Sequence, residues 1–559
     1  MIRTLATLVL LAAALALHLR GLQPWLDRPD LQFDAVHVYL PLAQKFLSMG
    51  LDFLLTEPAV QAPPLAYLYP ALLGADLHAV CNANVVLSCL LLLLVYRTAS
   101  LWHSRLAGVL SALAFAASPL LKPYFPTALT EPPFLFLVGV WIWALSEWRV
   151  RDRALYLPIA GVALGLALLT RASLFYGLVL FVAVLGLQAL RTGERRAFFA
   201  HLLALAFPVA FIAKNYFALR FPFFTTGAGN ALYLGTSPLF GGFDPAYLGL
   251  VYDVGAITQS PSHLSIAADR MLAAAGRSLL STLDAGDLAA MYAHKLAAFL
   301  FITNAENGGD VFALRAFRIA TLILSAFGLA AIRDRWLRAL VASVIACQVL
   351  VHVPVLYNHR YSVGALDVWL ATLSGVGLAR IWQRRGVELT VAATALIAGI
   401  MAGGYVAWNS GMPQPNVFAA ENVLVWETRD EAMRFPTRQG VLEIEIPDAP
   451  EFSQWFNHVM VLDSTLQKGS SDAACGQARF TYRRHDGEGF SAPLAWKLHP
   501  DGQRHLEQLG AEIPLRLGTG GRLRIEVDCA PASTWQVHRL AVYSARGALA
   551  LRERVRRTD

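Results

Sequence analysis

Charged residues are scarce in this sequence. Of its 559 residues 15% are charged, whereas a typical soluble protein carries about 25%. Cysteine is also rare: the chain has five, with no Cys-x-x-Cys pair, which argues against a zinc ribbon or a disulfide scaffold. No inverted repeat is visible and few ionisable residues interrupt the apolar runs, which disfavours a transporter. The low share of charged residues argues against a single soluble domain.

Hydrophobic residues make up 56% of the chain, and the mean hydropathy is +0.48. This excludes a disordered chain and predicts an α-helical, polytopic membrane protein. The net charge of +7, from 46 basic and 39 acidic residues, is typical of cytoplasmic loops and does not indicate nucleic-acid binding. Eleven spans are predicted, at 4–19, 76–95, 106–121, 132–147, 154–170, 173–190, 198–218, 313–331, 337–355, 362–379 and 388–408.

Arginines gather in every second loop, which predicts the orientation. They follow spans two, four, six, eight and ten, so the positive-inside rule places these loops and the N-terminus in the cytoplasm. The first span could instead be a cleaved signal peptide, since it joins a basic start to an apolar core. The segments expected to face outward are 20–75, 118–131, 171–172, 219–312, 356–361 and everything after 408.

The composition changes after residue 409. Segments at 441–446, 522–527 and 536–543 alternate between apolar and polar residues, which indicates strands with one buried face. We therefore expect two domains, a membrane domain over 1–409 and a β-rich, sandwich-like domain over 410–559 outside the membrane. Cys475 and Cys529 lie in that second domain, where a disulfide could persist.

The first outward loop carries an acid before a helical pattern. Asp34 precedes apolar residues at helical spacing, including Tyr39, which predicts an amphipathic helix in the membrane interface. Asp34 could be functional or simply the N-cap of that helix. His37 lies in the same stretch, but it has no regular spacing to another histidine, which favours a role other than metal binding. A Pro63-Pro64 pair predicts the start of a second interfacial helix.

Further charged residues stand at the outer ends of later spans. Glu131 follows Thr130 at the membrane edge, where an acid is costly unless used or paired, although it could also help to cap its helix. Arg171 and Arg360 each begin an outer connection or span, and either could bind phosphate or anchor its helix in the interface. Lys122 is a weaker candidate in the second outer loop.

Taken together, these segments resemble the GT-C superfamily of membrane glycosyltransferases, in particular bacterial members similar to the aminoarabinose transferase of lipid A and the protein O-mannosyltransferases. The resemblance covers about residues 1–380. It rests on five places in order, which are Asp34 with Tyr39 and Ala43, Pro63-Pro64-Leu65, Thr130-Glu131-Pro132, Leu169-Thr170-Arg171, and the stretch from Lys214-Asn215-Tyr216 to Gly235.

Two positions depart from the family pattern. Relatives often have two adjacent acids in the first loop, whereas Ala35 follows Asp34 here. The lipid A relatives have a lysine before the Pro-Pro pair, whereas this chain has Ala62. The second departure argues against aminoarabinose as the sugar.

The resemblance implies transfer of a sugar from a polyprenyl-phosphate donor to lipid A, an envelope glycan or a protein, at the outer face of a bacterial cytoplasmic membrane. It implies Asp34 as the base, with Glu131 orienting the acceptor or, if a divalent metal is used, joining Asp34 as its ligand. Arg171, Arg360 and Lys122 would bind the donor phosphate, and His37, Tyr39 and Tyr361 the substrates. A lipid-linked glycan polymerase or ligase, a transporter and a non-catalytic scaffold are the alternatives.

Overall fold

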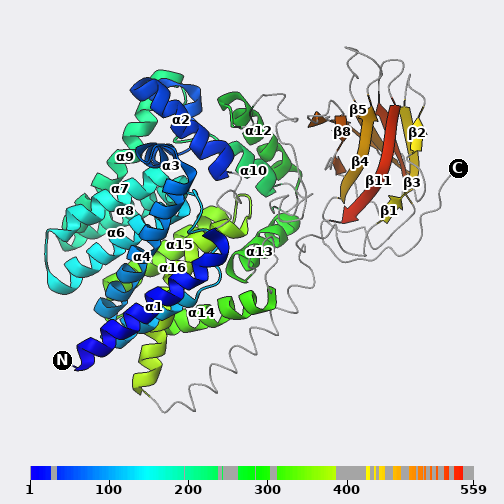
Figure 1. Ribbon diagram of the computed structural model, residues 1–559. Helices are drawn as coiled ribbons and strands as arrows, with labels where there is room; N and C mark the ends of the chain where they lie inside the picture. Colours follow the sequence, from blue (N-terminus) through cyan, green and yellow to red (C-terminus); the bar gives the residue numbers. More distant parts are fainter. Residues whose placement is uncertain are drawn as a thin grey trace.

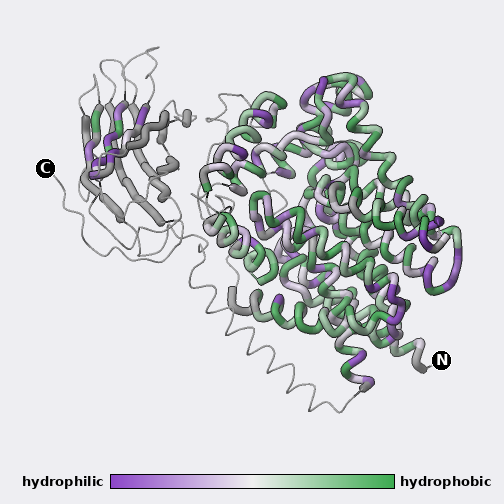
Figure 2. Tube along the Cα trace, turned by 180° about the vertical axis from the view of Figure 1, so that it is seen from behind, coloured by the Kyte–Doolittle hydropathy of each residue, from purple (hydrophilic) through white to green (hydrophobic). Residues whose placement is uncertain are grey.

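The computed structural model describes residues 2–26, 34–193, 195–236, 264–283, 285–301 and 311–384, a few positions between 242 and 262, and strands between 424 and 544. Helices fill the first part and strands the second (Figure 1). Figure 2 shows hydrophobic positions running along the helices, with hydrophilic ones gathered near helix ends. This is the pattern expected of a helical membrane domain.

The helices follow the apolar runs closely. The helices at these runs are α1 (Ile2–Leu26), α4 (Leu77–Trp102), α5 (Arg105–Ala117), α6 (Glu131–Arg151), α7 (Tyr156–Thr170), α8 (Phe175–Thr192), α9 (Arg196–Leu219), α14 (Val311–Ala331), α15 (Arg335–His352) and α16 (His359–Arg384). Each coincides with one of the first ten predicted spans, while the eleventh, 388–408, lies outside the described residues.

Six of the described helices are long and apolar enough to cross a membrane, namely Thr4–Leu26, Leu77–Trp102, Glu131–Arg151, Ala172–Arg191, Arg196–Leu219 and Arg335–His352. Three more, Arg105–Ala117, Tyr156–Thr170 and Ala316–Ala331, are apolar but shorter. The protein is therefore a multi-pass membrane protein by length and composition. The total of eleven crossings, the membrane and the orientation stay predictions.

The loop between the first two predicted spans, which we expect to face outward, folds as a series of short helices. These are the π-helix η1 (Ala35–Tyr39), α2 (Leu40–Met49), η2 (Gly50–Leu55), η3 (Glu57–Val60) and α3 (Pro64–Leu72). The helices expected after Asp34 and after Pro63 are both present. Apolar side chains of α2, η2 and α3 form a small core of their own around Phe53 and Tyr67, whose ring centroids lie 5.4 Å apart. Val38 and Tyr39 of η1, which follow Asp34 in the sequence, pack against this core.

The region expected as a long outer loop, 219–312, also contains helices. These are α10 (Ala228–Thr236), α12 (Ile266–Thr282) and α13 (Ala285–Phe301). Elsewhere, the short helix η4 (Ala172–Leu174) precedes α8.

At the end of α6 remote from Glu131, the buried carboxylate of Glu147 contacts Arg97 at 2.7 Å and Arg151 at 3.2 Å. Helix α6 thus carries one buried acid at each end.

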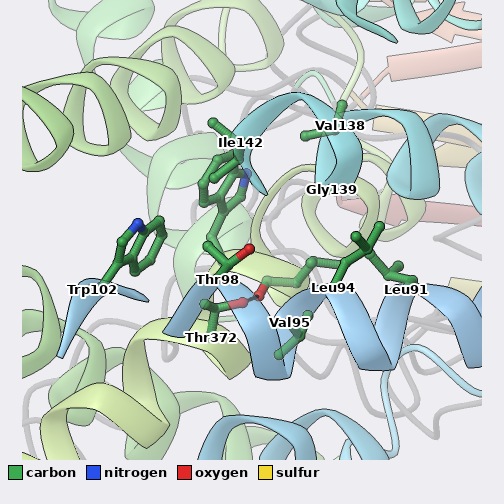
Figure 3. A pocket seen from close by; sticks show the side chains of 11 residues that line it. Leu91, Leu94, Val95, Thr98, Trp102, Val138, Gly139, Ile142 and Thr372 are labelled. Carbon is green, nitrogen blue, oxygen red and sulfur yellow. Dashed lines mark hydrogen bonds between the residues drawn. The ribbon is translucent and has the colours of Figure 1, made fainter. Parts of the chain in front are cut away.

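A narrow apolar crevice separates α4, α6 and α16 inside the helical domain (Figure 3). Its volume is about 20 Å³. Gly139 of α6 faces Leu91 across it, and the nearby hydroxyl of Thr372 donates to the carbonyl of Val368 on its own helix. The crevice holds no charged side chain among its lining residues, so it offers packing space and no chemistry.

The C-terminal strands form two antiparallel sheets. One has the order β1-β11-β4-β8-β7, with β2 on β11 and β9 on β4, and the other has the order β3-β10-β5-β6. The strand bounds are Leu424–Glu427, Met433–Phe435, Gly440–Ile446, His458–Gln467, Ala478–Arg484, Gly489–Leu494, Lys497–Leu498, Arg504–Leu506, Ala511–Ile513, Gly521–Val527 and Thr534–Ser544 for β1 to β11.

Strands β3, β10 and β11 lie where the alternating segments predicted them. In β10 Leu523 and Ile525 are fully buried, whereas Arg524 between them is exposed and contacts Glu443 at 2.8 Å. This alternation explains the sequence pattern. The packing of the two sheets into a sandwich and the division at residue 409 stay predictions. Cys475 and Cys529 lie outside the described residues, so their pairing also stays a prediction.

Candidate active site

Four charged side chains from distant parts of the sequence meet at one end of the helical domain. The Nη1 of Arg360 donates to Oδ2 of Asp34 at 2.6 Å, and its Nε donates to Oε1 of Glu131. The same Oε1 lies 2.5 Å from Nη1 of Arg171. We call Asp34, Glu131, Arg171 and Arg360 the ion-pair cluster. It joins the start of η1 to the ends of α6, α7 and α16.

Each member stands at the end of a helix, which explains how the fold assembles the cluster. Asp34 precedes η1, and Glu131 is the first residue of α6. Arg171 follows α7 with an extended backbone, and Arg360 is the second residue of α16. Neither Asp34 nor Thr130 makes a side-chain capping hydrogen bond. The capping alternative is therefore wrong for Asp34, whose carboxylate is held by Arg360 instead.

The two acids differ in their access to water. The side chain of Glu131 is 1% exposed and that of Asp34 is 43% exposed, while both arginines are 12% exposed. Glu131 therefore depends on Arg171 and Arg360, because a buried carboxylate is costly without paired charges. The accessible carboxylate is that of Asp34.

A cavity of about 670 Å³ opens beside the cluster, a volume within the usual range for small-molecule sites. Asp34, Arg171 and Arg360 line it, and Glu131 lies behind them outside the lining. Hydroxyl and amide side chains continue the polar wall. They belong to Gln61, Thr130, Thr170, Ser173, Thr225, Thr226 and Asn230. An anion and a polyhydroxylated group could thus be bound together.

Two aromatic residues predicted to bind substrate line the same cavity. Tyr39 lies next to Asp34, and burial, helped by that carboxylate, raises the pKa of its phenol. Tyr39 therefore stays protonated and can donate a hydrogen bond. Tyr361 lies with its ring 5.7 Å from the guanidinium carbon of Arg171, a cation–π distance that fixes the arginine. His37, by contrast, is exposed on η1 and is not among the residues that line the cavity.

Lys122 does not join the cluster. Its Nζ lies 2.6 Å from Nδ1 of His18, whose Nε2 lies 2.8 Å from the hydroxyl of Ser88. Burial lowers the pKa of Lys122 to about 8. Lys122, which was predicted to bind phosphate, thus lies in a buried polar network with residues of α1 and α4. It is not among the described residues that line the cavity.

Only some of the other residues that line the cavity could be predicted from the sequence. The segment 225–231 was recognised as a family-like stretch, but the residue that holds it was missed. Asp269 of α12 accepts hydrogen bonds from the backbone amides of Gly227 and Gly229, at 2.7 and 2.8 Å. His352, at the end of α15, also lines the cavity, and its ring centroid lies 5.5 Å from that of Tyr361. No sequence spacing connects either residue to the cluster.

The cluster does not fit a divalent-metal site. Among the described residues, no group of three or more His, Cys, Asp or Glu side chains comes together. Asp34 and Glu131 would supply two carboxylates, but each contacts a guanidinium group. A cation between them would be repelled by Arg171 and Arg360. We therefore derive no step through a metal.

Comparison with known proteins gives one family match. Residues 61–216 match the family model described as dolichyl-phosphate-mannose-protein mannosyltransferase. This segment includes Glu131 and Arg171. No curated protein sequence matches the chain.

Solved structures of an oligosaccharyltransferase from Archaeoglobus fulgidus are similar in part. The AglB complex with an inhibitory peptide and a dolichol-phosphate has 13% identity and a TM-score of 0.38, and covers 71% of this chain and 54% of that one. The apo form has 13% identity and a TM-score of 0.40, covering 70% and 54%. The complex with Zn and sulfate has 12% identity and a TM-score of 0.38, covering 70% and 51%. The chain thus spans about half the length of these structures.

Proposed function

We propose that this protein transfers a sugar from a polyprenyl-phosphate donor to an acceptor hydroxyl at the outer face of the cytoplasmic membrane. The family match over residues 61–216 confirms the predicted resemblance to the GT-C superfamily of membrane glycosyltransferases. The observation that carries the proposal is the ion-pair cluster, three of whose members, Asp34, Arg171 and Arg360, line the cavity. It sets an accessible carboxylate beside two fixed positive charges.

In the proposed reaction, Asp34 takes the proton from the acceptor hydroxyl, whose oxygen then bonds to the anomeric carbon of the donor. The bond between that carbon and the phosphate oxygen breaks, and the oxygen leaves with the electron pair. Arg171 and Arg360 stabilise the negative charge on the departing lipid phosphate. The products are the glycosylated acceptor and the polyprenyl phosphate.

Glu131 acts in this proposal as a positioning residue, because it contacts both arginines but does not line the cavity. Tyr39 and Tyr361 support the site from its walls, Tyr39 as a hydrogen-bond donor and Tyr361 by stacking near Arg171. The acceptor is lipid A, an envelope glycan or a protein, and the sugar is a hexose or a pentose. Lipid-linked glycan polymerisation is the competing function with the same donor chemistry.

The test is transfer by the purified protein in lipid nanodiscs, using polyprenyl-phosphate sugars. Acceptors are found by comparing lipid A, envelope glycans and glycoproteins, by mass spectrometry, from cells with and without the protein. Asp34→Asn should lower turnover roughly 10²–10⁴-fold with little change in donor binding, because the amide keeps the shape but cannot take the proton. Near-normal transfer by Asp34→Asn would refute the proposed base. Growth of a repeating polymer would favour the polymerase alternative.

A further inference from the structure

We propose that Arg220 and Arg270 form a binding site for the headgroup of an anionic phospholipid of the surrounding membrane, and that the bound lipid holds α12 against the end of α9. The site is separate from the cavity, because neither arginine is among the described residues that line it. It binds a lipid other than the sugar donor, so it does not depend on the proposed function.

The two arginines come from distant parts of the sequence and meet without an acid. Arg220 follows the last residue of α9, and Arg270 lies in the second turn of α12. The Nη2 of Arg270 donates to the backbone carbonyl of Arg220 at 3.3 Å. The ring of Tyr216 lies 5.6 Å from the guanidinium carbon of Arg220, a cation–π distance. Both arginines are exposed, and neither forms an ion pair among the described residues. One phosphate could therefore accept from both guanidinium groups.

The backbone of Arg220 indicates that its side chain has a use. Its φ angle is +52°, in the left-handed region, where helices commonly end on glycine because a Cβ atom makes this conformation costly. Its amide ends α9 by donating to the carbonyls of Asn215 and Tyr216. Glycine would end the helix in the same way at lower cost. Backbone strain of this kind is typical of functional positions.

Exposed apolar side chains near the two arginines favour a phospholipid over a soluble anion. Phe217 and Phe223, three residues on either side of Arg220, are 75% and 55% exposed, and Met271 beside Arg270 is also exposed. Helix α9 is long and apolar enough to cross a membrane and ends at Leu219. The residues that follow it are therefore expected at the level of the headgroups, where aromatic residues gather. A phospholipid offers its phosphate to the arginines and its acyl chains to the apolar side chains.

Helix α12 connects this site to the wall of the cavity. Asp269, the residue before Arg270, is buried and accepts hydrogen bonds from the amides of Gly227 and Gly229. A Cβ atom built on Gly229 would clash with the carbonyl oxygen of Asp269, so α10 and α12, which lie side by side in Figure 1, pack backbone against backbone. Gly227 itself lines the cavity. A lipid that holds Arg270 in place therefore also holds this wall.

The first experiment measures lipid binding by the full chain in detergent micelles, from the fluorescence of phosphatidylglycerol labelled with a nitrobenzoxadiazole group. Arg220→Gly and Arg270→Gln should each raise Kd about tenfold or more, because each removes a charge-assisted hydrogen bond to the phosphate. Labelled phosphatidylcholine, which has no net charge, should bind more weakly than phosphatidylglycerol. Equal affinity of the wild type and both variants would overturn the proposal, and so would displacement of the lipid by millimolar inorganic phosphate.

Two control variants test whether the site is local. Arg277 is also exposed on α12, but it lies seven residues, or about 10.5 Å along the helix axis, from Arg270. Arg277→Gln removes the same charge and should change Kd less than about twofold, by the distance dependence of charge interactions. Arg171→Ala should leave Kd unchanged, because Arg171 belongs to the ion-pair cluster. Equal losses in Arg270→Gln and Arg277→Gln would indicate general attraction to charge, and a loss in Arg171→Ala would place the lipid in the cavity. Either result would refute the site.

Two further measurements distinguish lipid binding from a purely structural role. Amide hydrogen exchange over residues 227–231 should slow about tenfold with phosphatidylglycerol at ten times its Kd, but not in Arg270→Gln. Without this lipid, Arg220→Gly should melt at a higher temperature than the wild type, because glycine adopts the left-handed conformation freely; with the lipid, it should gain less stability. Unchanged exchange would refute the link to the cavity wall. A lower melting temperature of Arg220→Gly without lipid would show that Arg220 supports the fold alone.

Discussion

The buried carboxylate of Glu131 gives a sharp test of the cluster, because α6 carries a matched carboxylate at its other end. Glu131→Gln keeps the side-chain shape and removes one negative charge. The side chain is 1% exposed and contacts Arg171 and Arg360, each 12% exposed. Removing one partner of a buried ion pair costs about 3–5 kcal/mol. Because Arg360 keeps its contact with Asp34, we expect the lower end, about 3 kcal/mol.

The same substitution should strengthen anion binding. Two carboxylates and two guanidinium groups give the ion-pair cluster a formal charge of zero. In Glu131→Gln the sum becomes positive, so a lipid phosphate should bind more tightly than to the wild type. At about 100 times its Kd, a ligand adds about 2.7 kcal/mol to the free energy of unfolding. At the one lipid concentration that is 100 times the Kd of the variant, polyprenyl phosphate should therefore stabilise Glu131→Gln by about 2.7 kcal/mol and the more weakly binding wild type by less, while sugar transfer falls.

Glu147→Gln is the control. Glu147 also contacts two arginines and its side chain is 2% exposed, but Arg97 and Arg151 are 35% and 41% exposed. Water can solvate them after the change, so the cost should be about 1 kcal/mol or less. Thermal unfolding in nanodiscs, with and without polyprenyl phosphate, measures both variants. Equal losses in the two variants, or no extra stabilisation of Glu131→Gln by the lipid, would refute the reasoning.

Three further predictions address the phosphate site, Lys122 and the topology. Arg171→Ala should weaken donor binding and lower kcat, and Arg171→Lys should restore only part of each, because lysine lacks the planar fork; full recovery in the kinetics would contradict this. Lys122→Met should leave donor KM unchanged. Burial lowers the pKa of Lys122 from 10.5 to about 8, so between pH 8 and 10.5 the unfolded chain binds more protons than the folded protein. The stability of the wild type should therefore rise with pH in this range, and the rise should be smaller in Lys122→Met. Melting temperatures measured across this pH range test the prediction. An impermeant maleimide should label Leu51→Cys, which is 74% exposed at that position, and label Arg153→Cys only after permeabilisation; the reverse pattern would invert the predicted orientation.

The helical part of the fold was largely predictable, because a membrane span needs a long apolar run that can be read directly along the chain. The helices α10, α12 and α13 were not predicted. Helix α12 has a polar face, with Asp269 and Arg270 in its sequence, so it lacks the apolar run on which the span prediction depends. The strands β3 and β10 were predictable because their two faces have different surroundings, as Leu523 and Arg524 show.

The residue types of the ion-pair cluster could be predicted from the sequence, but the contacts between these residues could not. Asp34, Glu131, Arg171 and Arg360 were all expected in outer segments, but only the fold shows that Arg360 contacts both acids. Lys122 has the same chemistry and was assigned to the same side, yet its side chain points to His18. A sequence gives the position of a helix end but not the direction in which a side chain at that end points.

The ion-pair cluster also has a consequence for how the protein is made. Asp34 and Arg360 are 326 residues apart in the sequence, so the ribosome needs roughly 15–65 s, at 5–20 residues per second, to synthesise the chain between them. During that time the carboxylates of Asp34 and Glu131 lack the guanidinium group of α16. A chain that stops before α16 would keep most of its membrane helices but never complete the cluster. The packing of α16 against the earlier helices is therefore the step at which a newly made chain first acquires its site.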